Sequence, residues 1–235
     1  MLVESTSTTG FFVPLFGFII SYGFGYLLGS IPFGLLLTKM AGLGDIRKVG
    51  SGNIGATNVL RTGNKGLAAL TLALDALKGA VAVWIGQQYT PEMGMLAGAA
   101  AMLGHSYPVW LKYKGGKGVA TAFGLSCALN LPMGLAIGFT WLIVLVLVRF
   151  SSLAAISAAL LSPLYAWLFG NSKLVLFYFG ACAFVWWRHR ANFKRLLDGT
   201  ETTISLGKKG KTLDSSDISQ TPDNAADATS PTKPE

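Results

Sequence analysis

The chain has 235 residues, of which 51% are hydrophobic and 13% charged, and its mean hydropathy is +0.50. A soluble domain usually carries about 25% charged residues, so this composition indicates a membrane protein. The formal net charge is +8, but no basic soluble face is evident, which argues against nucleic-acid binding. The two cysteines lie in apolar runs with neither a disulfide nor a metal-ligand spacing. We therefore expect no metal ion and no cofactor.

Seven apolar stretches follow one another along the chain, and most approach the length of about 20 residues that crosses a bilayer as a helix. They are residues 13–38, 67–86, 93–111, 119–131, 133–148, 153–169 and 174–187. Pro132 divides a run that is too long for one straight helix. The sequence predicts an all-α integral membrane protein with about seven transmembrane helices, and five or six spans are the alternatives.

The positive charges gather in alternate loops. Of the 19 Lys and Arg residues, 17 lie in residues 39–66, 112–118, 149–152 and 188–235. Because cytoplasmic loops are enriched in Lys and Arg, we expect the N-terminus outside and the C-terminus in the cytoplasm. Residues 203–235 are polar and are predicted to form a disordered cytoplasmic tail after a membrane domain of residues 1–202.

The first polar cluster is the loop 44–66, "GDIRKVGSGNIGATNVLRTGNKG". Glycine allows the backbone to approach a ligand closely, and successive N–H groups can then bind an anion. Basic and amide side chains would add to such a site. The sequence therefore predicts phosphate binding here, against the alternative of an ordinary flexible loop. The candidate residues are Arg47, Ser51, Asn53, Asn58 and Arg61.

The second cluster is the segment "LKYKGGKGVAT", which joins two apolar stretches. It is not a nucleotide-binding P-loop, because Gly118 follows Lys117 where that motif requires Ser or Thr. Glycine N–H groups, lysines and the start of a helix nevertheless favour an anion. The candidates for phosphate binding are Lys114, Gly115, Gly116, Lys117 and Gly118.

Titratable residues elsewhere are open to a structural or a functional interpretation. His189 and Asn192 follow the last span at a spacing of three, so a helix would place them on one face. Asp75 and Lys78 have the same spacing inside the second span, and intramembrane charges are usually paired or functional. We favour a structural ion pair for Asp75 and Lys78, and leave His105 undecided.

Three clusters of residues suited to binding phosphate lie at one membrane face. They suggest two anionic ligands, one from water and one from lipid. Together the motifs "GSGNIGATNVLRTGNKG", "GHSYPVWLKYKGGKGVAT" and "HRANFKRLLDGTE" resemble those of the bacterial acyl-phosphate:glycerol-3-phosphate acyltransferases, the PlsY family. The resemblance covers roughly residues 20–202, in the same order and spacing.

The resemblance implies an enzyme of the bacterial inner membrane that begins phospholipid synthesis. It would move a fatty acyl group from acyl phosphate to the 1-hydroxyl of glycerol 3-phosphate, giving lysophosphatidic acid. The family assigns an essential serine and arginine, matching Ser51 and Arg61. Its glycine-rich glycerol-phosphate site matches residues 115–118, its histidine and asparagine match His189 and Asn192, and a structural glutamate matches Glu201.

Two mechanisms are compatible with these residues. The glycerol hydroxyl attacks the acyl phosphate directly, with His189 or the donor phosphate taking the proton, or Ser51 attacks first and forms an acyl-enzyme. We favour direct attack, because the donor is already activated. A transporter for an organic phosphate and an acyl-CoA-dependent acyltransferase are the rival functions. The oligomeric state is not predictable from the sequence.

Overall fold

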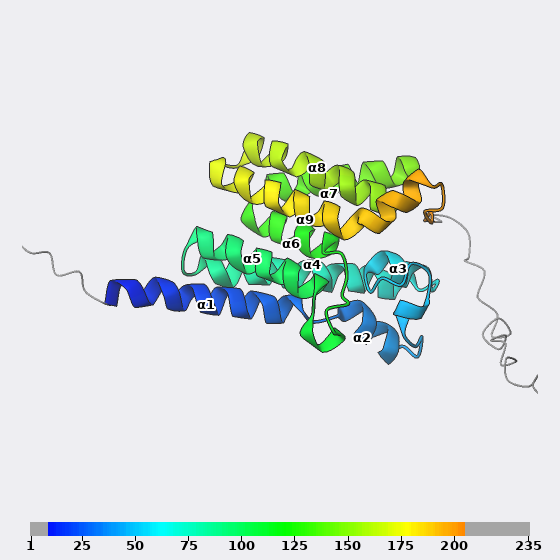
Figure 1. The fold of residues 1–235 in the computed structure, drawn as a ribbon, viewed down its shortest axis with the longest axis horizontal. Helices are drawn as coiled ribbons and strands as arrows, with labels where there is room; N and C mark the ends of the chain where they lie inside the picture. The colour runs from blue at the N-terminus through cyan, green and yellow to red at the C-terminus, as the bar shows by residue number, and fades with distance from the viewer. Residues whose placement is uncertain (1–8, 205–235) are drawn as a thin grey trace, which may run out of the picture.

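The computed structural model describes residues 9–204, with side chains from residue 16 onward. Within that range it is all helical and contains no strand, as predicted (Figure 1). The helices are α1 (Thr9–Gly29), α2 (Phe33–Met40), α3 (Ala56–Leu60), α4 (Lys65–Gln87), α5 (Pro91–Ser106), α6 (Val119–Leu129), α7 (Leu131–Val148), α8 (Ser151–Phe169) and α9 (Ser172–Leu197).

Seven of these helices, α1 and α4–α9, lie roughly side by side in one bundle (Figure 1). Short connections make α4 and α5, α7 and α8, and α8 and α9 antiparallel neighbours, while α1 packs on α5 and α6 packs on α4. The small helices α2 and α3 and the last turns of α9 share one end of the bundle (Figure 1). Residues 41–64 therefore lie at that end, and Lys117 of the second motif contacts Asn192 of α9.

Two of the predicted spans end earlier than expected, each at a proline. The predicted span 13–38 divides into α1 and α2, because Pro32 has no N–H to continue the helix and disfavours helical backbone at the residue before it. The predicted span 93–111 stops as α5 at Ser106, because Tyr107 precedes Pro108 and has a φ of −135°. Residues 109–111 form a separate 3-10 turn.

The predicted break near Pro132 is present, and Asn130 organises it. The Asn130 side chain accepts a hydrogen bond from the Met133 N–H at 3.0 Å, which caps α7. Pro132 lies in the first turn, where its missing N–H costs nothing. The preceding helix α6 has 11 residues, about 16 Å. This is roughly half the thickness of the hydrocarbon core.

Four segments are long and apolar enough to cross a membrane: Phe16–Met40, Lys65–Gln87, Leu131–Val148 and Ser151–Phe169. The helices α5 and α6 are shorter than the usual range of about 17–25 residues. The last helix, α9, is 26 residues long, but its second half is basic. Helix length and hydropathy alone therefore support four spans.

Two glycines allow the backbones of α4 and α6 to touch. A Cβ atom at Gly124 would lie 1.8 Å from the Ala76 carbonyl oxygen, and one at Gly79 would lie 2.3 Å from the Thr121 oxygen. Small residues commonly permit such close approach between membrane helices. This contact holds the start of α6, and the loop before it, against the middle of α4.

The close contact predicts a strong effect of Gly124→Leu. We expect a loss of at least about 1–3 kcal/mol of stability, because a side chain cannot fit without separating α4 from α6. Thermal unfolding in detergent measures this change. Gly180→Leu is the control, because a Cβ atom at Gly180 would have no neighbour within 4 Å. Equal melting temperatures for the two variants would contradict the packing described here.

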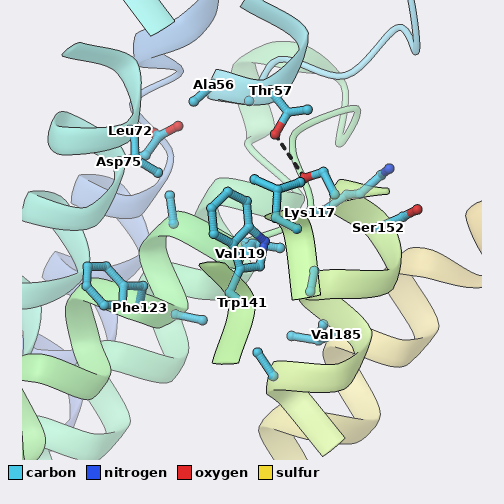
Figure 2. Close-up of a pocket in the computed structure, with 18 of the residues that line it drawn as sticks. Ala56, Thr57, Leu72, Asp75, Lys117, Val119, Phe123, Trp141, Ser152 and Val185 are labelled. Carbon is cyan, nitrogen blue, oxygen red and sulfur yellow. Dashed lines mark hydrogen bonds between the residues drawn. The ribbon is translucent and has the colours of Figure 1, made fainter. Parts of the chain in front are cut away.

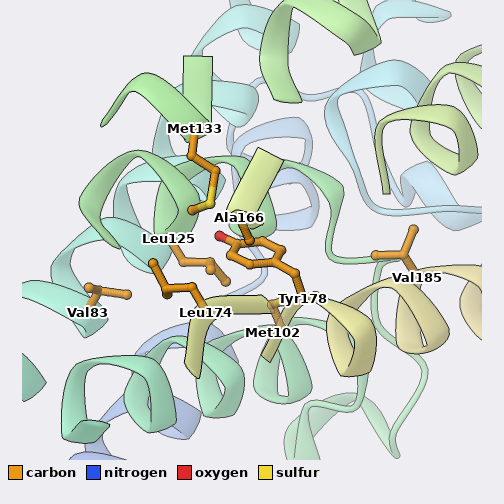
Figure 3. Close-up of a cluster of buried hydrophobic side chains, with 8 residues drawn as sticks. All are labelled: Val83, Met102, Leu125, Met133, Ala166, Leu174, Tyr178 and Val185. Carbon is orange, nitrogen blue, oxygen red and sulfur yellow. The ribbon is translucent and has the colours of Figure 1, made fainter. Parts of the chain in front are cut away.

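A buried apolar cluster fixes α9 in the bundle (Figure 3). Tyr178 lies at its centre, 3% exposed, and its hydroxyl donates to the Ser126 Oγ at 2.7 Å. The cluster contains Val83, Met102, Leu125, Met133, Ala166, Leu174, Tyr178 and Val185. These contacts come from α4 to α9, so the position of α9 depends on most of the bundle.

The chain folds back over the bundle after α9. Ile204 is buried beside Leu145 and Ala154, and its N–H donates to the Arg149 carbonyl oxygen at 2.8 Å. Ordered packing thus continues two residues past the predicted domain boundary at residue 202. The rest of the predicted tail, residues 205–235, lies outside the described residues.

Candidate active site

A cavity of about 630 Å³ opens beside α4 and α6–α9. Figure 2 shows part of its wall, from Lys117 at the polar end to apolar side chains such as Phe123, Trp141 and Val185. The predicted site residues that border this cavity are Ser51, Asn53, Arg61, Lys117, Gly118, His189 and Asn192. The same cavity therefore has a polar end and an apolar end.

Asn58 organises the first motif from within. Its amide nitrogen lies 2.9 Å from the carbonyl oxygens of Ile46 and Val49 and 2.8 Å from that of Asn53. Its side-chain oxygen accepts from the Ser51 N–H at 3.0 Å. Asn58 is 1% exposed and does not border the cavity. Its predicted contact with phosphate is therefore replaced by a role in shaping the loop.

Ser51 and Arg61 occupy the cavity rim beside this loop. The Ser51 hydroxyl donates to the Asn58 oxygen at 3.3 Å, and Arg61 Nη1 donates to the same oxygen at 3.3 Å. Arg61 Nη2 also donates to the Thr202 hydroxyl at 2.5 Å, which joins the loop to the segment that follows α9. Arg47, by contrast, lies outside the cavity and pairs with Asp45 at 2.5 Å.

Two glycines of the second motif, Gly115 and Gly116, do not present free N–H groups, contrary to expectation. The N–H of Gly115 donates to the Ser106 oxygen at 3.2 Å, and that of Gly116 donates to the His105 oxygen at 2.9 Å. A Cβ atom at Gly116 would lie 2.0 Å from His105 Nε2. These glycines allow the loop to lie flat on α5. Lys114 does not border the cavity either.

Lys117 and Gly118 do reach the cavity. Lys117 Nζ donates to the Asn192 side-chain oxygen at 2.5 Å. Gly118 has a φ of +82°, which suits glycine, and it begins α6 without a side-chain cap. The first N–H groups of α6 have no carbonyl partner within the helix. The cation of Lys117 and this helix end together have the charge and the free donors that suit an anion.

His189 and Asn192 face the cavity from one side of α9. His189 Nδ1 lies 2.8 Å from the Val185 carbonyl oxygen. Because a carbonyl can only accept, Nδ1 carries the proton and Nε2 is left as the basic nitrogen. Asn192 bridges Lys117 and Glu201, donating to the Glu201 Oε1 at 2.7 Å.

Glu201 holds three segments together behind the site. Ser152 donates to its Oε1 at 2.9 Å and Arg195 donates to its Oε2 at 2.7 Å. Burial alone would raise the pKa of Glu201, but hydrogen bonds from Asn192, Ser152 and Arg195 together lower it. The carboxylate is therefore charged at neutral pH. It fixes the Asn192 amide so that the amide oxygen faces Lys117.

The cavity wall also contains residues that the sequence did not single out for the site. Ser152 and Thr202 border it, as do the indole of Trp141 and the carboxylate of Asp75. A hydrogen bond of 3.0 Å between Thr57 and Ser151 joins α3 to α8 beside them (Figure 2). No motif marks Ser152 in the sequence, because its role depends on where α8 begins in space.

The titration of Lys117 predicts how kcat/KM falls at alkaline pH. Burial lowers its pKa to about 8, and the nearby arginines add to this shift. The ammonium is charged below that pH and is lost as the pH rises through it. We expect kcat/KM to fall toward tenfold per pH unit above pH 8. Lys117→Arg stays charged, so steady-state assays should show the fall displaced upward. An unchanged limb would assign it to another group.

The sequence matches those of known acyltransferases over most of its length. Residues 19–199 match the family described as glycerol-3-phosphate acyltransferase. The chain belongs to this family. A glycerol-3-phosphate acyltransferase of Mesorhizobium japonicum is 54% identical over 195 residues, which is 83% of this chain and 99% of the relative. One of Sinorhizobium medicae is 56% identical over 187 residues, covering 80% and 91%.

Two crystal structures of PlsY (YgiH), an integral membrane glycerol 3-phosphate acyltransferase, share the fold. Its glycerol 3-phosphate form is 37% identical with a TM-score of 0.75, covering 80% of this chain and 96% of that one. Its lysophosphatidic acid form is 35% identical with a TM-score of 0.74, covering 80% and 95%. This glycerol-3-phosphate acyltransferase family member is accordingly a multi-pass membrane protein and an acyltransferase.

Proposed function

We propose that the chain transfers a fatty acyl group from acyl phosphate to the 1-hydroxyl of glycerol 3-phosphate, giving lysophosphatidic acid and phosphate. The observation that carries this proposal is the single cavity with two unlike ends. Lys117, Arg61 and the start of α6 suit phosphate groups, and the apolar walls suit an acyl chain. The relatives' names and the two ligand forms of PlsY support the acceptor and the product.

The cavity is long as well as apolar. Along α9 its lining residues run from Asn192 to Tyr178, fourteen residues of helix or about 21 Å. Such a length accommodates much of an extended fatty acyl chain, with its phosphate end near Lys117. The water-soluble acceptor would enter at the rim, where Ser51 and Arg61 lie.

Direct attack is the mechanism that we favour. The acceptor oxygen bonds to the acyl carbon, the bond from that carbon to the phosphate oxygen breaks, and phosphate leaves. The hydroxyl proton passes to His189 Nε2 or to the donor phosphate. In the described structure the Ser51 hydroxyl contacts Asn58 and not a histidine. Ser51 therefore lacks a base that would make it a nucleophile, and we assign it to binding phosphate.

We also propose seven spans, with the N-terminus outside and the site at the cytoplasmic face of the bacterial inner membrane. The helices α1 and α4–α9 run along the bundle in alternating directions, which supports an odd number of crossings (Figure 1). The basic loops lie at the polar end of the cavity. Lys173, which lies at the start of α9 outside the basic loops, pairs with Glu92 at the start of α5. This distribution agrees with enrichment of Lys and Arg in the cytoplasm.

An assay of the purified protein in detergent tests the proposal against its rivals. Acyl phosphate and glycerol 3-phosphate should yield lysophosphatidic acid, whereas an organic-phosphate transporter would form no product. Acyl-CoA in place of acyl phosphate should yield none. Product from acyl-CoA alone would contradict the proposed donor. Addition of EDTA should leave the rate unchanged, because residues 9–204 contain no cluster of His, Cys, Asp and Glu that could hold a metal.

A further inference from the structure

A buried ionic cluster behind the second motif has no part in the mechanism described so far. Asp75, Lys78 and His105 are 1%, 2% and 4% exposed. Lys78 Nζ lies 2.8 Å from the Asp75 Oδ1, 2.9 Å from His105 Nδ1 and 2.8 Å from the Ile31 carbonyl oxygen. Burying charged groups in a membrane protein is costly, so a cluster of this kind is a functional candidate.

The contacts of Lys78 determine the tautomer of His105. A lysine ammonium has three protons to donate and no lone pair, and here it has three neighbouring acceptors. His105 Nδ1 also lies 3.5 Å from the Asp75 Oδ1, but a charged Lys78 at 2.9 Å can only donate to Nδ1, which places the proton of a neutral imidazole on Nε2. His189 has the opposite tautomer, because its Nδ1 donates to the Val185 oxygen. The two histidines of the chain thus offer one donor and one acceptor.

The Nε2 atom of His105 faces Gly116 of the second motif. A Cβ atom at Gly116 would lie 2.0 Å from it, and His105 itself borders the cavity. Among the described residues this nitrogen has no hydrogen-bond partner. Lys117, which follows Gly116, and the first residues of α6 border the same space. Asp75 also borders it (Figure 2), but Lys78 neutralises that carboxylate at 2.8 Å.

We propose that His105 is a catalytic residue that donates a hydrogen bond from Nε2 to a substrate phosphate bound between Lys117 and the start of α6. Asp75 and Lys78 are positioning residues that hold His105 in the donor tautomer. The assignment rests on the proposed function, since the phosphate belongs either to the acyl donor or to glycerol 3-phosphate. Both substrates carry a phosphate that can accept this hydrogen bond. The substrate whose KM depends on His105 is the one that provides it.

Two amide variants of His105 separate the loss of the hydrogen-bond donor at Nε2 from the loss of the packing of the imidazole ring. His105→Gln places an N–H near the position of Nε2, whereas His105→Asn reaches only the position of Nδ1. We expect His105→Asn to lower kcat/KM about 10- to 100-fold, as for a lost hydrogen bond to a charged group. His105→Gln should recover most of that loss. A raised KM for one substrate identifies the phosphate. Equal losses in both variants, or no loss in His105→Asn, would overturn the proposal.

A spectroscopic test works without turnover and without a variant of His105. Nitrogen-15 NMR of the histidine-labelled protein should show two neutral imidazoles of opposite tautomer, with His189→Ala giving the assignment. Inorganic phosphate should shift the Nε2 signal of His105, and Lys78→Met should abolish its single tautomer. A proton on His105 Nδ1, or no response to phosphate, would refute the assignment. Failure of the acyl transfer itself would instead refute the proposed function.

Discussion

Lys117→Met is expected to lower kcat/KM by about 10²–10³-fold. The change nearly preserves the length of the side chain and removes a half-buried cation that faces the cavity beside Asn192. A charge-assisted hydrogen bond is typically worth about 1.5–3 kcal/mol, and the proposed reaction brings two phosphate groups to this site. Steady-state kinetics with both substrates measures the loss, and we expect kcat and KM to change together.

Lys114→Met is the matched control for that experiment. Lys114 lies three residues earlier on the same loop but does not border the cavity. Its replacement removes the same charge and should change kcat/KM by no more than a few-fold, mainly through long-range attraction. If the two variants lost activity equally, the effect would come from the basic surface as a whole. The specific role of Lys117 would then be wrong.

His189→Ala should lower kcat by about 10²–10⁴-fold while the protein still folds. His189 Nε2 is the basic nitrogen at the cavity, and a positioned base typically contributes that much. Its hydrogen bond to Val185 lies within α9, so losing the ring leaves the helix ladder intact. A pH–rate profile and a melting curve together separate a lost base from a lost fold.

Arg190→Ala is the comparison for this variant. Arg190 directly follows His189 on α9 and stacks on the exposed Trp187, away from the site. Its loss should leave kcat nearly unchanged. Full activity of His189→Ala at every pH would exclude His189 as a base. The donor phosphate would then be the remaining acceptor for the hydroxyl proton.

The sequence predicted the all-helical membrane fold, because the length of an apolar stretch depends on local composition. It predicted the break near Pro132 for the same reason. It did not predict that α1 ends at Gly29, since the hydropathy of residues 16–40 continues through the break. The end of a helix depends on the backbone at Pro32, to which hydropathy is insensitive.

The site residues stay predictions, and the structure adds where they lie. Ser51, Arg61, Lys117, His189 and Asn192 border one cavity. The sequence could not show which polar groups satisfy one another inside the protein. Asn58 and the N–H groups of Gly115 and Gly116 are consumed by the loops themselves. Ser152 borders the cavity because α8 begins beside it, and His105 borders the cavity because α5 ends beside it.

The sharpest test of direct transfer is the release of phosphate from acyl phosphate when glycerol 3-phosphate is absent. With enzyme in stoichiometric amounts, the structure predicts no rapid release and no acyl adduct by mass spectrometry. Addition of glycerol 3-phosphate should then release phosphate and form lysophosphatidic acid at the same rate. One equivalent of phosphate released beforehand, with an acyl group on Ser51, would contradict direct attack.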